Sequence, residues 1–189
     1  MAGIIFVNVG LGKGKTRSCL HLVKRAREDG VGVGGIVSPR IFSGTRLVGY
    51  DAIDCATGKK FPLARIHAPE NDPDWFTFGH LGYFFSRKGF IRANEILCKT
   101  AKLRNSLPVM IVDEVGRLEM KGEGLYSGLM DVVENRVGRE SVVVLSCRSD
   151  VLGWTQRLVK NRTVPHISWT PGEPEDLWRL VEPSLLGYS

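Results

Sequence analysis

A chain of 189 residues, 43% hydrophobic and 24% charged, has the length and composition of one globular domain with a core of its own. It has no run of about 18 apolar residues to span a bilayer, and its start lacks the basic segment and cleavage site of a secretion signal. We therefore expect a single domain over residues 1–189 that works in the cytoplasm without a membrane partner.

The formal net charge of +6 suits a polyanionic partner, either a nucleotide or a nucleic acid. Basic residues cluster in segments 24–27 and 99–104 at helical spacing, which is typical of a solvated helix face. Because no recognition-helix or RNA-binding signature accompanies them, we do not expect nucleic acid to be a partner. The four cysteines lack the spacing of a zinc site or a disulfide framework, so we expect them to be reduced and mostly buried.

The first landmark is an apolar run from Ile4 to Val9, followed by a glycine-rich segment and then by a helical pattern through Ala26. A glycine-rich turn over a helix N-terminus presents several N–H donors to one phosphate, and the helix dipole favours its negative charge. We therefore expect a phosphate-binding loop here. Its candidate nucleotide-binding residues are Gly10, Leu11, Gly12, Lys13, Gly14, Lys15, Thr16 and Arg17.

This segment is close to the P-loop pattern G-x-x-x-x-G-K-[ST], in which the lysine reaches the β- and γ-phosphates and the hydroxyl binds Mg²⁺. Gly14, Lys15 and Thr16 match the pattern, whereas Val9 stands where the first glycine is expected. A flexible surface loop is the alternative interpretation. The strand pattern before the segment and the helical pattern after it favour phosphate binding.

The next part of the chain predicts an insertion into the sheet. Segment 31–37 has the pattern of a second strand, and glycines and prolines then separate three short segments, 36–42, 46–54 and 61–66. This spacing predicts an antiparallel meander. The tract 67–78 has two prolines and little periodicity, so we expect a surface loop there that can act as a lid.

Six aromatic residues lie in or just after that tract: Trp75, Phe76, Phe78, Tyr83, Phe84 and Phe85. Rings at this density either stack on a purine base or anchor a loop to the core, and anchoring is the commoner role. Segment 91–103 then has the periodicity of a helix.

The second landmark is the apolar run Val109–Val112, which ends in Asp113 and Glu114. Such a run predicts a buried parallel strand that emerges next to the phosphate loop. An acid at the end of that strand can hold Mg²⁺ through a water while the next acid faces the γ-phosphate, and we assign these roles to Asp113 and Glu114. An adjacent glutamate favours hydrolysis because it can polarise water, which a kinase must exclude.

The remaining pattern alternates helices and apolar strands. It predicts a helix over about 124–137, a strand over 141–146, a helix over 151–159, a strand over 164–168 and a helix over 173–181. Fully apolar strands are typical of a parallel sheet covered on both faces. Arg148 follows one of these strands at the edge where ligands bind, so a phosphate contact and a surface salt bridge are both open for it.

These motifs, in this order, resemble the small P-loop nucleoside-triphosphatases of the THEP family, also called cancer-related nucleoside-triphosphatases. The resemblance covers most of the chain. Its most specific block is 112–119, where Asp-Glu is followed by an aliphatic residue, Gly, a basic residue, an apolar residue and Glu. Segments 34–37, 44–51 and 82–84 also carry it.

The resemblance implies a Rossmann-like three-layer α/β fold with a mostly parallel central sheet and an antiparallel hairpin insertion at about 36–90. It also implies slow, Mg²⁺-dependent hydrolysis of ATP, GTP and other nucleoside triphosphates by a monomer with broad base tolerance. It makes Glu114 the candidate for activating water and Glu119 an acid near the site. Arg46 in the hairpin and Arg148 are further accessory candidates.

We therefore expect a nucleoside-triphosphatase in which Lys15 neutralises charge on the γ-phosphate, Thr16 and Asp113 position Mg²⁺, and Glu114 orients the attacking water. One alternative is a P-loop kinase for a nucleotide or small molecule. Another is a nucleotide-dependent switch or assembly factor that acts on a protein partner, although no such partner is indicated by the sequence.

Overall fold

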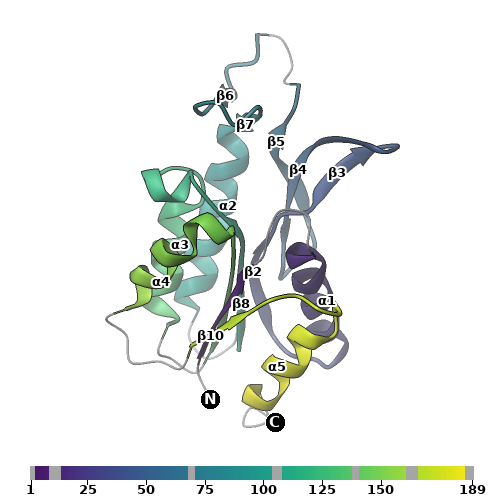
Figure 1. The fold of residues 1–189 in the computed structure, drawn as a ribbon, viewed down its shortest axis with the longest axis vertical. Coiled ribbons are helices and arrows are strands. Elements are labelled where there is room, and N and C mark those ends of the chain that lie inside the picture. The colour runs from purple at the N-terminus through teal and green to yellow at the C-terminus, as the bar shows by residue number, and fades with distance from the viewer. Residues whose placement is uncertain are drawn as a thin grey trace.

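The computed structural model describes residues 3–8, 14–67, 71–103, 108–137, 141–160 and 166–185. Segment 9–13, which holds Val9 and the glycine-rich start of the expected phosphate loop, lies outside these residues. Figure 1 shows a twisted sheet with helices packed against both of its faces.

Five parallel strands form one half of the sheet, in the order β10-β1-β9-β8-β2. They are β1 (Gly3–Asn8), β2 (Val33–Val37), β8 (Val109–Val115), β9 (Val142–Cys147) and β10 (His166–Trp169). Alternate side chains of β1 enter the two opposite cores, Ile4 and Phe6 one of them and Ile5 and Val7 the other. A strand buried on both faces requires a continuous apolar run, which is the pattern of the sequence.

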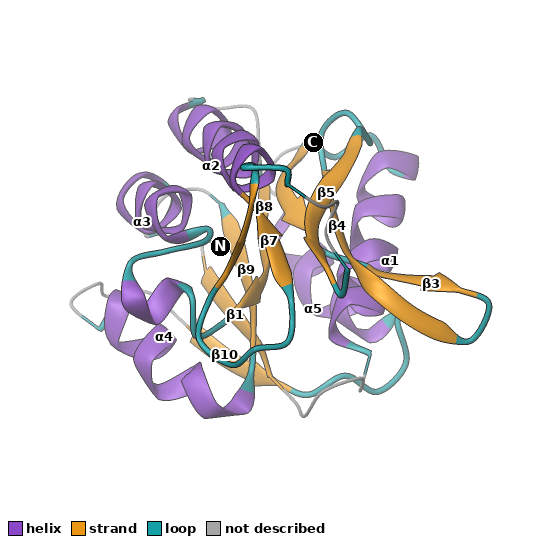
Figure 2. Ribbon diagram, turned by 90° about the horizontal axis from the view of Figure 1, so that it is seen from above, coloured by secondary structure: helices purple, strands orange, loops and turns teal. Residues whose placement is uncertain are grey.

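The other half of the sheet is antiparallel and continues the order as β2-β4-β5-β7-β6, with β3 paired to β4. Its strands are β3 (Arg40–Ser43), β4 (Arg46–Asp54), β5 (Lys60–Arg65), β6 (Trp75–Thr77) and β7 (Phe84–Ser86). The sheet therefore has the expected parallel centre and an antiparallel insertion after the second strand. In Figure 2 the β3–β4 hairpin projects away from the parallel strands.

Two expectations for the insertion are wrong. Segment 36–42 is not one strand, because its first residues belong to β2 and its last to β3, which pairs with β4. The tract 67–78 is not loop throughout, because Trp75–Thr77 pairs with Phe84–Ser86. A three-residue edge strand is too short to show a period of two in the sequence.

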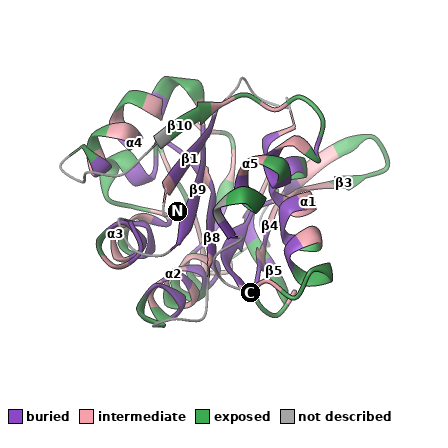
Figure 3. Cartoon of the chain, turned by 90° about the horizontal axis from the view of Figure 1, so that it is seen from below, coloured by how far each residue is buried: buried purple, intermediate pink, exposed green. Residues whose placement is uncertain are grey.

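Two layers of helices cover the sheet, as Figures 2 and 3 show. Helices α1 (Lys15–Glu28) and α5 (Asp176–Leu185) contribute to one core. Helices α2 (Arg87–Lys102), α3 (Tyr126–Asn135) and α4 (Leu152–Val159) contribute to the other. Two short 3₁₀ helices, η1 (Glu119–Lys121) and η2 (Ser149–Val151), follow β8 and β9. None of the helices within the described ranges has the length and apolarity needed to cross a membrane.

Helix boundaries depend on capping. Helix α2 begins at Arg87, four residues before the expected start, because the Ser86 hydroxyl accepts a hydrogen bond from the Gly89 N–H at 2.9 Å. Helix α5 begins at Asp176 and extends beyond Val181.

All four cysteines are free, and only Cys98 is not fully buried.

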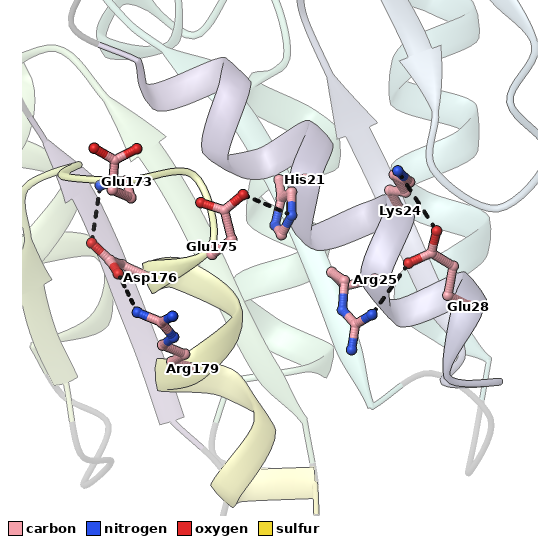
Figure 4. A network of polar contacts seen from close by, with 8 residues as sticks. All are labelled: His21, Lys24, Arg25, Glu28, Glu173, Glu175, Asp176 and Arg179. Carbon is pink, nitrogen blue, oxygen red and sulfur yellow. Dashed lines mark hydrogen bonds and ion pairs between the residues drawn. The ribbon is translucent and has the colours of Figure 1, made fainter.

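Helix α1, whose first turn begins the expected phosphate site, packs against α5 and the residue before it. The His21 Nε2 atom lies 3.4 Å from a carboxylate oxygen of Glu175, which directly precedes α5 (Figure 4). The Arg25 guanidinium lies over the Trp178 ring of α5. Leu22 of α1 is buried in the same core as Leu177 of α5. The closing helix therefore helps to fix the position of α1.

Candidate nucleotide-binding site

The carboxyl ends of the parallel strands meet at one edge of the sheet, and the candidate residues gather there. Lys15 and Thr16 begin α1 after β1, and Asp113 and Glu114 lie at the end of β8. Strand β9 separates β1 from β8, so the acids end a strand that is not next to β1. Helix α1 crosses the sheet and contacts both β8 and β2. Ser146 of β9 occupies the intervening position.

The start of α1 is suited to an anion. Gly14 precedes the helix with φ +95°, a left-handed conformation that glycine adopts without strain. The Gly14 carbonyl accepts the first hydrogen bond of the helix, from the Ser18 N–H at 2.9 Å. The first turn contains no acidic residue. The side chain of Lys15 is buried at 5% exposure, Thr16 is half-buried and Arg17 is exposed. The structure thus places Lys15 and Thr16 in the site and Arg17 on the surface.

Asp113 is fully buried beneath this edge. Its Oδ2 atom accepts a hydrogen bond from the Ser38 N–H at 3.0 Å, whereas Oδ1 has no hydrogen-bond partner within the described part of the chain. Burial raises the pKa of Asp113, and the Ser146 hydroxyl, the Ser38 N–H, the Thr16 hydroxyl and the Lys15 charge oppose that rise. A buried oxygen without a partner is costly unless something else binds it.

Glu114 has an unusual backbone. Its φ of +65° is left-handed, which is rare for a residue with a side chain and costs about 1–3 kcal/mol. The pairing of β8 with β9 shifts register between Val112 and Val115, so the strand is irregular at the two acids. Strain of this kind persists only where the surrounding fold imposes it, and it concentrates at functional sites.

The charge state of Glu114 is set by its surroundings. Burial and the neighbouring Asp113 raise the pKa of Glu114 to about 7, against the lowering effects of Lys15, Arg40 and Arg148. A carboxyl group with a pKa near neutrality suits a group that accepts a proton from water.

The residues present fit Mg²⁺. This ion prefers oxygen ligands, and proteins bind it through one or two carboxylates together with phosphate oxygens and water. Asp113 Oδ1 supplies a buried carboxylate oxygen, and the Thr16 hydroxyl lies near enough to Asp113 to influence its pKa. Across the described ranges no three His, Cys, Asp or Glu residues cluster as metal ligands, so phosphate and water would complete the coordination of an ion held here.

Glu119 has a supporting position. It is buried, and both of its carboxylate oxygens accept backbone N–H groups, from Gly116 at 2.7 Å and from Leu125 at 2.8 Å. Burial raises the pKa of Glu119, against the effect of these N–H donors. Glu119 therefore holds the turn that follows β8 and does not face the phosphate site with a free oxygen.

The two accessory arginines lie in different places. The Arg148 Nε atom donates to Asp150 Oδ1 at 2.9 Å, and Arg117 forms an ion pair with the same carboxylate at 2.8 Å, so Asp150 joins both guanidinium groups beside Glu114. Arg46 is exposed on the β3–β4 hairpin, where Nη2 lies 3.1 Å from His67 Nε2. The structure does not bring Arg46 to the site.

A cavity of about 180 Å³ adjoins Glu114 on the side of the insertion. Its lining includes Ser38, Tyr50 and Arg117, which the sequence interpretation did not single out as site residues. Arg117 lies in the specific block 112–119, and this position is the feature of the sequence that could have identified it as a site residue. Ser38 and Tyr50 come close to Glu114 only through the pairing of the sheet, which a sequence does not display.

Comparisons with known proteins identify the family of this chain. A family model described as NTPase matches residues 4–180. The nucleoside-triphosphatase THEP1 of Methanopyrus kandleri is 36% identical over 118 residues, and that of Saccharolobus solfataricus is 28% identical over 117 residues. Each alignment spans 62% of this chain and only 60% and 62%, respectively, of the two relatives' lengths.

Two solved structures share the fold. THEP1 from Aquifex aeolicus superposes with a TM-score of 0.59 at 22% identity and covers 96% of this chain and 99% of that one. A human cancer-related nucleoside triphosphatase gives a TM-score of 0.59 at 18% identity and covers 100% of this chain and 97% of its own. The Rossmann-like three-layer α/β fold expected from the sequence is thus confirmed.

Proposed function

The chain belongs to the NTPase family, and from this premise we propose that it hydrolyses nucleoside triphosphates such as ATP and GTP to the diphosphate and phosphate. We propose that the reaction depends on Mg²⁺, is slow and tolerates different bases. The observation that carries this proposal is the convergence of Lys15, Asp113 and a strained Glu114 at the carboxyl edge of the sheet. We further propose one domain over residues 1–189, with about 36–90 as an insertion, that acts as a cytoplasmic monomer.

Phosphate binding is assigned to the start of α1. The N–H groups of the first helical turn have no partner within the helix and carry the positive end of its dipole. Lys15 adds a full positive charge in a buried setting, where an electrostatic interaction is stronger than in water. Together they would bind the β- and γ-phosphates and stabilise the charge that develops during transfer.

Thr16 and Asp113 are the residues that would hold the metal. An Mg²⁺ ion held by these residues would supply positive charge that offsets part of the negative charge of the phosphates. The Ser38 N–H donates a hydrogen bond to one carboxylate oxygen of Asp113. The other oxygen has no partner within the described residues, and we assign it to the metal. Ser146 and Lys15 keep Asp113 closer to its charged form than burial alone would allow.

Glu114 is assigned to the attacking water. Its carboxylate orients the water and accepts its proton while the water oxygen bonds to the γ-phosphorus and the bond to the bridging oxygen breaks. Glu114 directly follows Asp113 at the irregular end of β8, where its backbone is left-handed. Positioning and charge stabilisation supply most of the rate enhancement in such a reaction.

The test is phosphate release from ATP, GTP and CTP, with and without Mg²⁺ and without any added phosphoryl acceptor. We expect metal-dependent release from all three nucleotides. A protein that binds Mg·ATP and releases no phosphate until an acceptor or a partner protein is added would be a kinase or a switch, and the proposal would be wrong.

A further inference from the structure

We infer that the cavity beside Glu114 is a binding site for a small second ligand, a single apolar ring that carries one hydroxyl group. The cavity lies between the insertion strands β4, β5 and β7, the start of α2 and the turn after β8. Among the residues that the structure describes, Glu114 lines it, whereas Lys15, Thr16 and Asp113 do not, so the cavity adjoins these three side chains without including them.

The lining of the cavity indicates that the main part of the ligand is an apolar ring. They are mainly apolar and include Leu63, Leu81, Phe85, Phe90, Leu118 and Leu125. An apolar cavity of about 150 Å³ with a similar lining accepts benzene, so a cavity of about 180 Å³ accepts one ring and a short substituent.

The aromatic residues of the insertion form a rigid side of this cavity. The Tyr50 and Tyr83 rings meet edge to face with centroids 5.4 Å apart, and the Phe85 and Phe90 rings lie 6.0 Å apart. Leu118 from the turn after β8 packs in the same cluster as Phe85. The rings thus anchor the insertion to the site and present faces and edges on which another ring can pack.

One end of the cavity is polar. Glu114, Arg148 and Ser38 all line it. The Ser38 side chain is only 2% exposed, and its Oγ atom has no hydrogen-bond partner within the described residues. A buried hydroxyl without a partner costs free energy, and a ligand hydroxyl would supply the missing hydrogen bond.

The position of this ligand relative to the nucleotide rests on the proposed function. If Glu114 faces the γ-phosphate, the cavity lies beyond the triphosphate end of the nucleotide, away from the base. It is therefore not the base site, and its occupant is a second molecule. Binding to the cavity itself requires no nucleotide, so this inference and the proposed function can fail separately.

The experiment is a nucleotide-free titration of the protein with phenol, followed by the methyl NMR signals of Leu63, Leu118 and Leu125. We expect saturable shifts with a Kd of about 1 mM, the affinity that a ligand of seven non-hydrogen atoms commonly reaches in a fitting cavity. Toluene, which has the same number of non-hydrogen atoms but neither donates nor accepts a hydrogen bond, should bind at least threefold more weakly. Absence of saturable shifts up to about 10 mM phenol in the folded protein would overturn the inference.

Three variants locate the binding. Leu81→Trp fills the cavity from a half-buried position and should weaken phenol binding at least tenfold, whereas Ile91→Trp, at an exposed position that does not line the cavity, should leave it unchanged. Ser38→Ala should remove the preference for phenol over toluene without abolishing ring binding. Equal phenol affinity in the parent and in folded Leu81→Trp would show that the ring binds elsewhere.

Discussion

Glu114 combines a costly backbone conformation with a buried carboxyl group. Its left-handed φ of +65° and its position beside Asp113 both oppose the folded state. A residue that contributed only to stability would not be expected under these two penalties. Its assignment as the water-orienting group gives a reason for them, because functional sites commonly retain such strain.

Replacement of Glu114 by glutamine tests the assignment. Glutamine has nearly the same shape but does not accept a proton from water, so kcat should fall by about 10²- to 10⁴-fold while ATP affinity stays within a few-fold. Steady-state phosphate release and equilibrium nucleotide binding measure the two effects. Glu95→Gln, at an exposed position on α2, is the matched control. Parental turnover in Glu114→Gln would exclude this role.

The strain at Glu114 makes a separate prediction about stability. Glycine adopts a left-handed backbone without penalty, whereas alanine does not. Glu114→Gly should therefore unfold with a free energy about 1 kcal/mol higher than that of Glu114→Ala, as measured by urea denaturation. If Glu114→Ala were as stable as Glu114→Gly or more stable, this would contradict a strained left-handed backbone at Glu114.

At the scale of elements, the turn between β8 and α3 positions both the site and the neighbouring cavity. Glu119 holds this turn by accepting the N–H groups of Gly116 and Leu125. Hydrogen bonds to a charged acceptor are worth more than neutral ones, and removal of the acceptor leaves two donors unsatisfied. The position of Glu119 thus explains its place in the block 112–119 without a direct part in chemistry.

Glu119→Ala should lower the free energy of unfolding by about 3 kcal/mol, the sum expected for two charge-assisted hydrogen bonds lost from a buried site. Urea denaturation measures the loss. Glu123→Ala, at an exposed position in the same turn, should change stability by less than about 0.5 kcal/mol. Similar effects of the two substitutions would mean that Glu119 does not hold the turn.

For the whole molecule, the sequence predicted the order in which strands and helices follow one another along the chain, because buried strands and amphipathic helices have distinct periods. It also indicated that Lys15 and Asp113 would share one edge, since parallel strands end together. It did not indicate that β9 lies between β1 and β8, nor that β6 pairs with β7, because strand pairing depends on contacts distant in the sequence. The backbone of Glu114 and the approach of Ser38 to Asp113 depend on the same pairing.

The whole molecule is proposed to bind and hydrolyse nucleoside triphosphates at the start of α1, and Lys15→Ala tests this most directly. Phosphate release from Mg·ATP and binding of Mg·ATP should be measured side by side for the parent, Lys15→Ala and Lys24→Ala, an exposed lysine on the same helix. We expect Lys15→Ala to lose at least about 10²-fold in turnover and most of its nucleotide affinity, because a buried positive charge at the phosphates is removed. Lys24→Ala should match the parent. Phosphate release by Lys15→Ala at the parental rate would contradict the account.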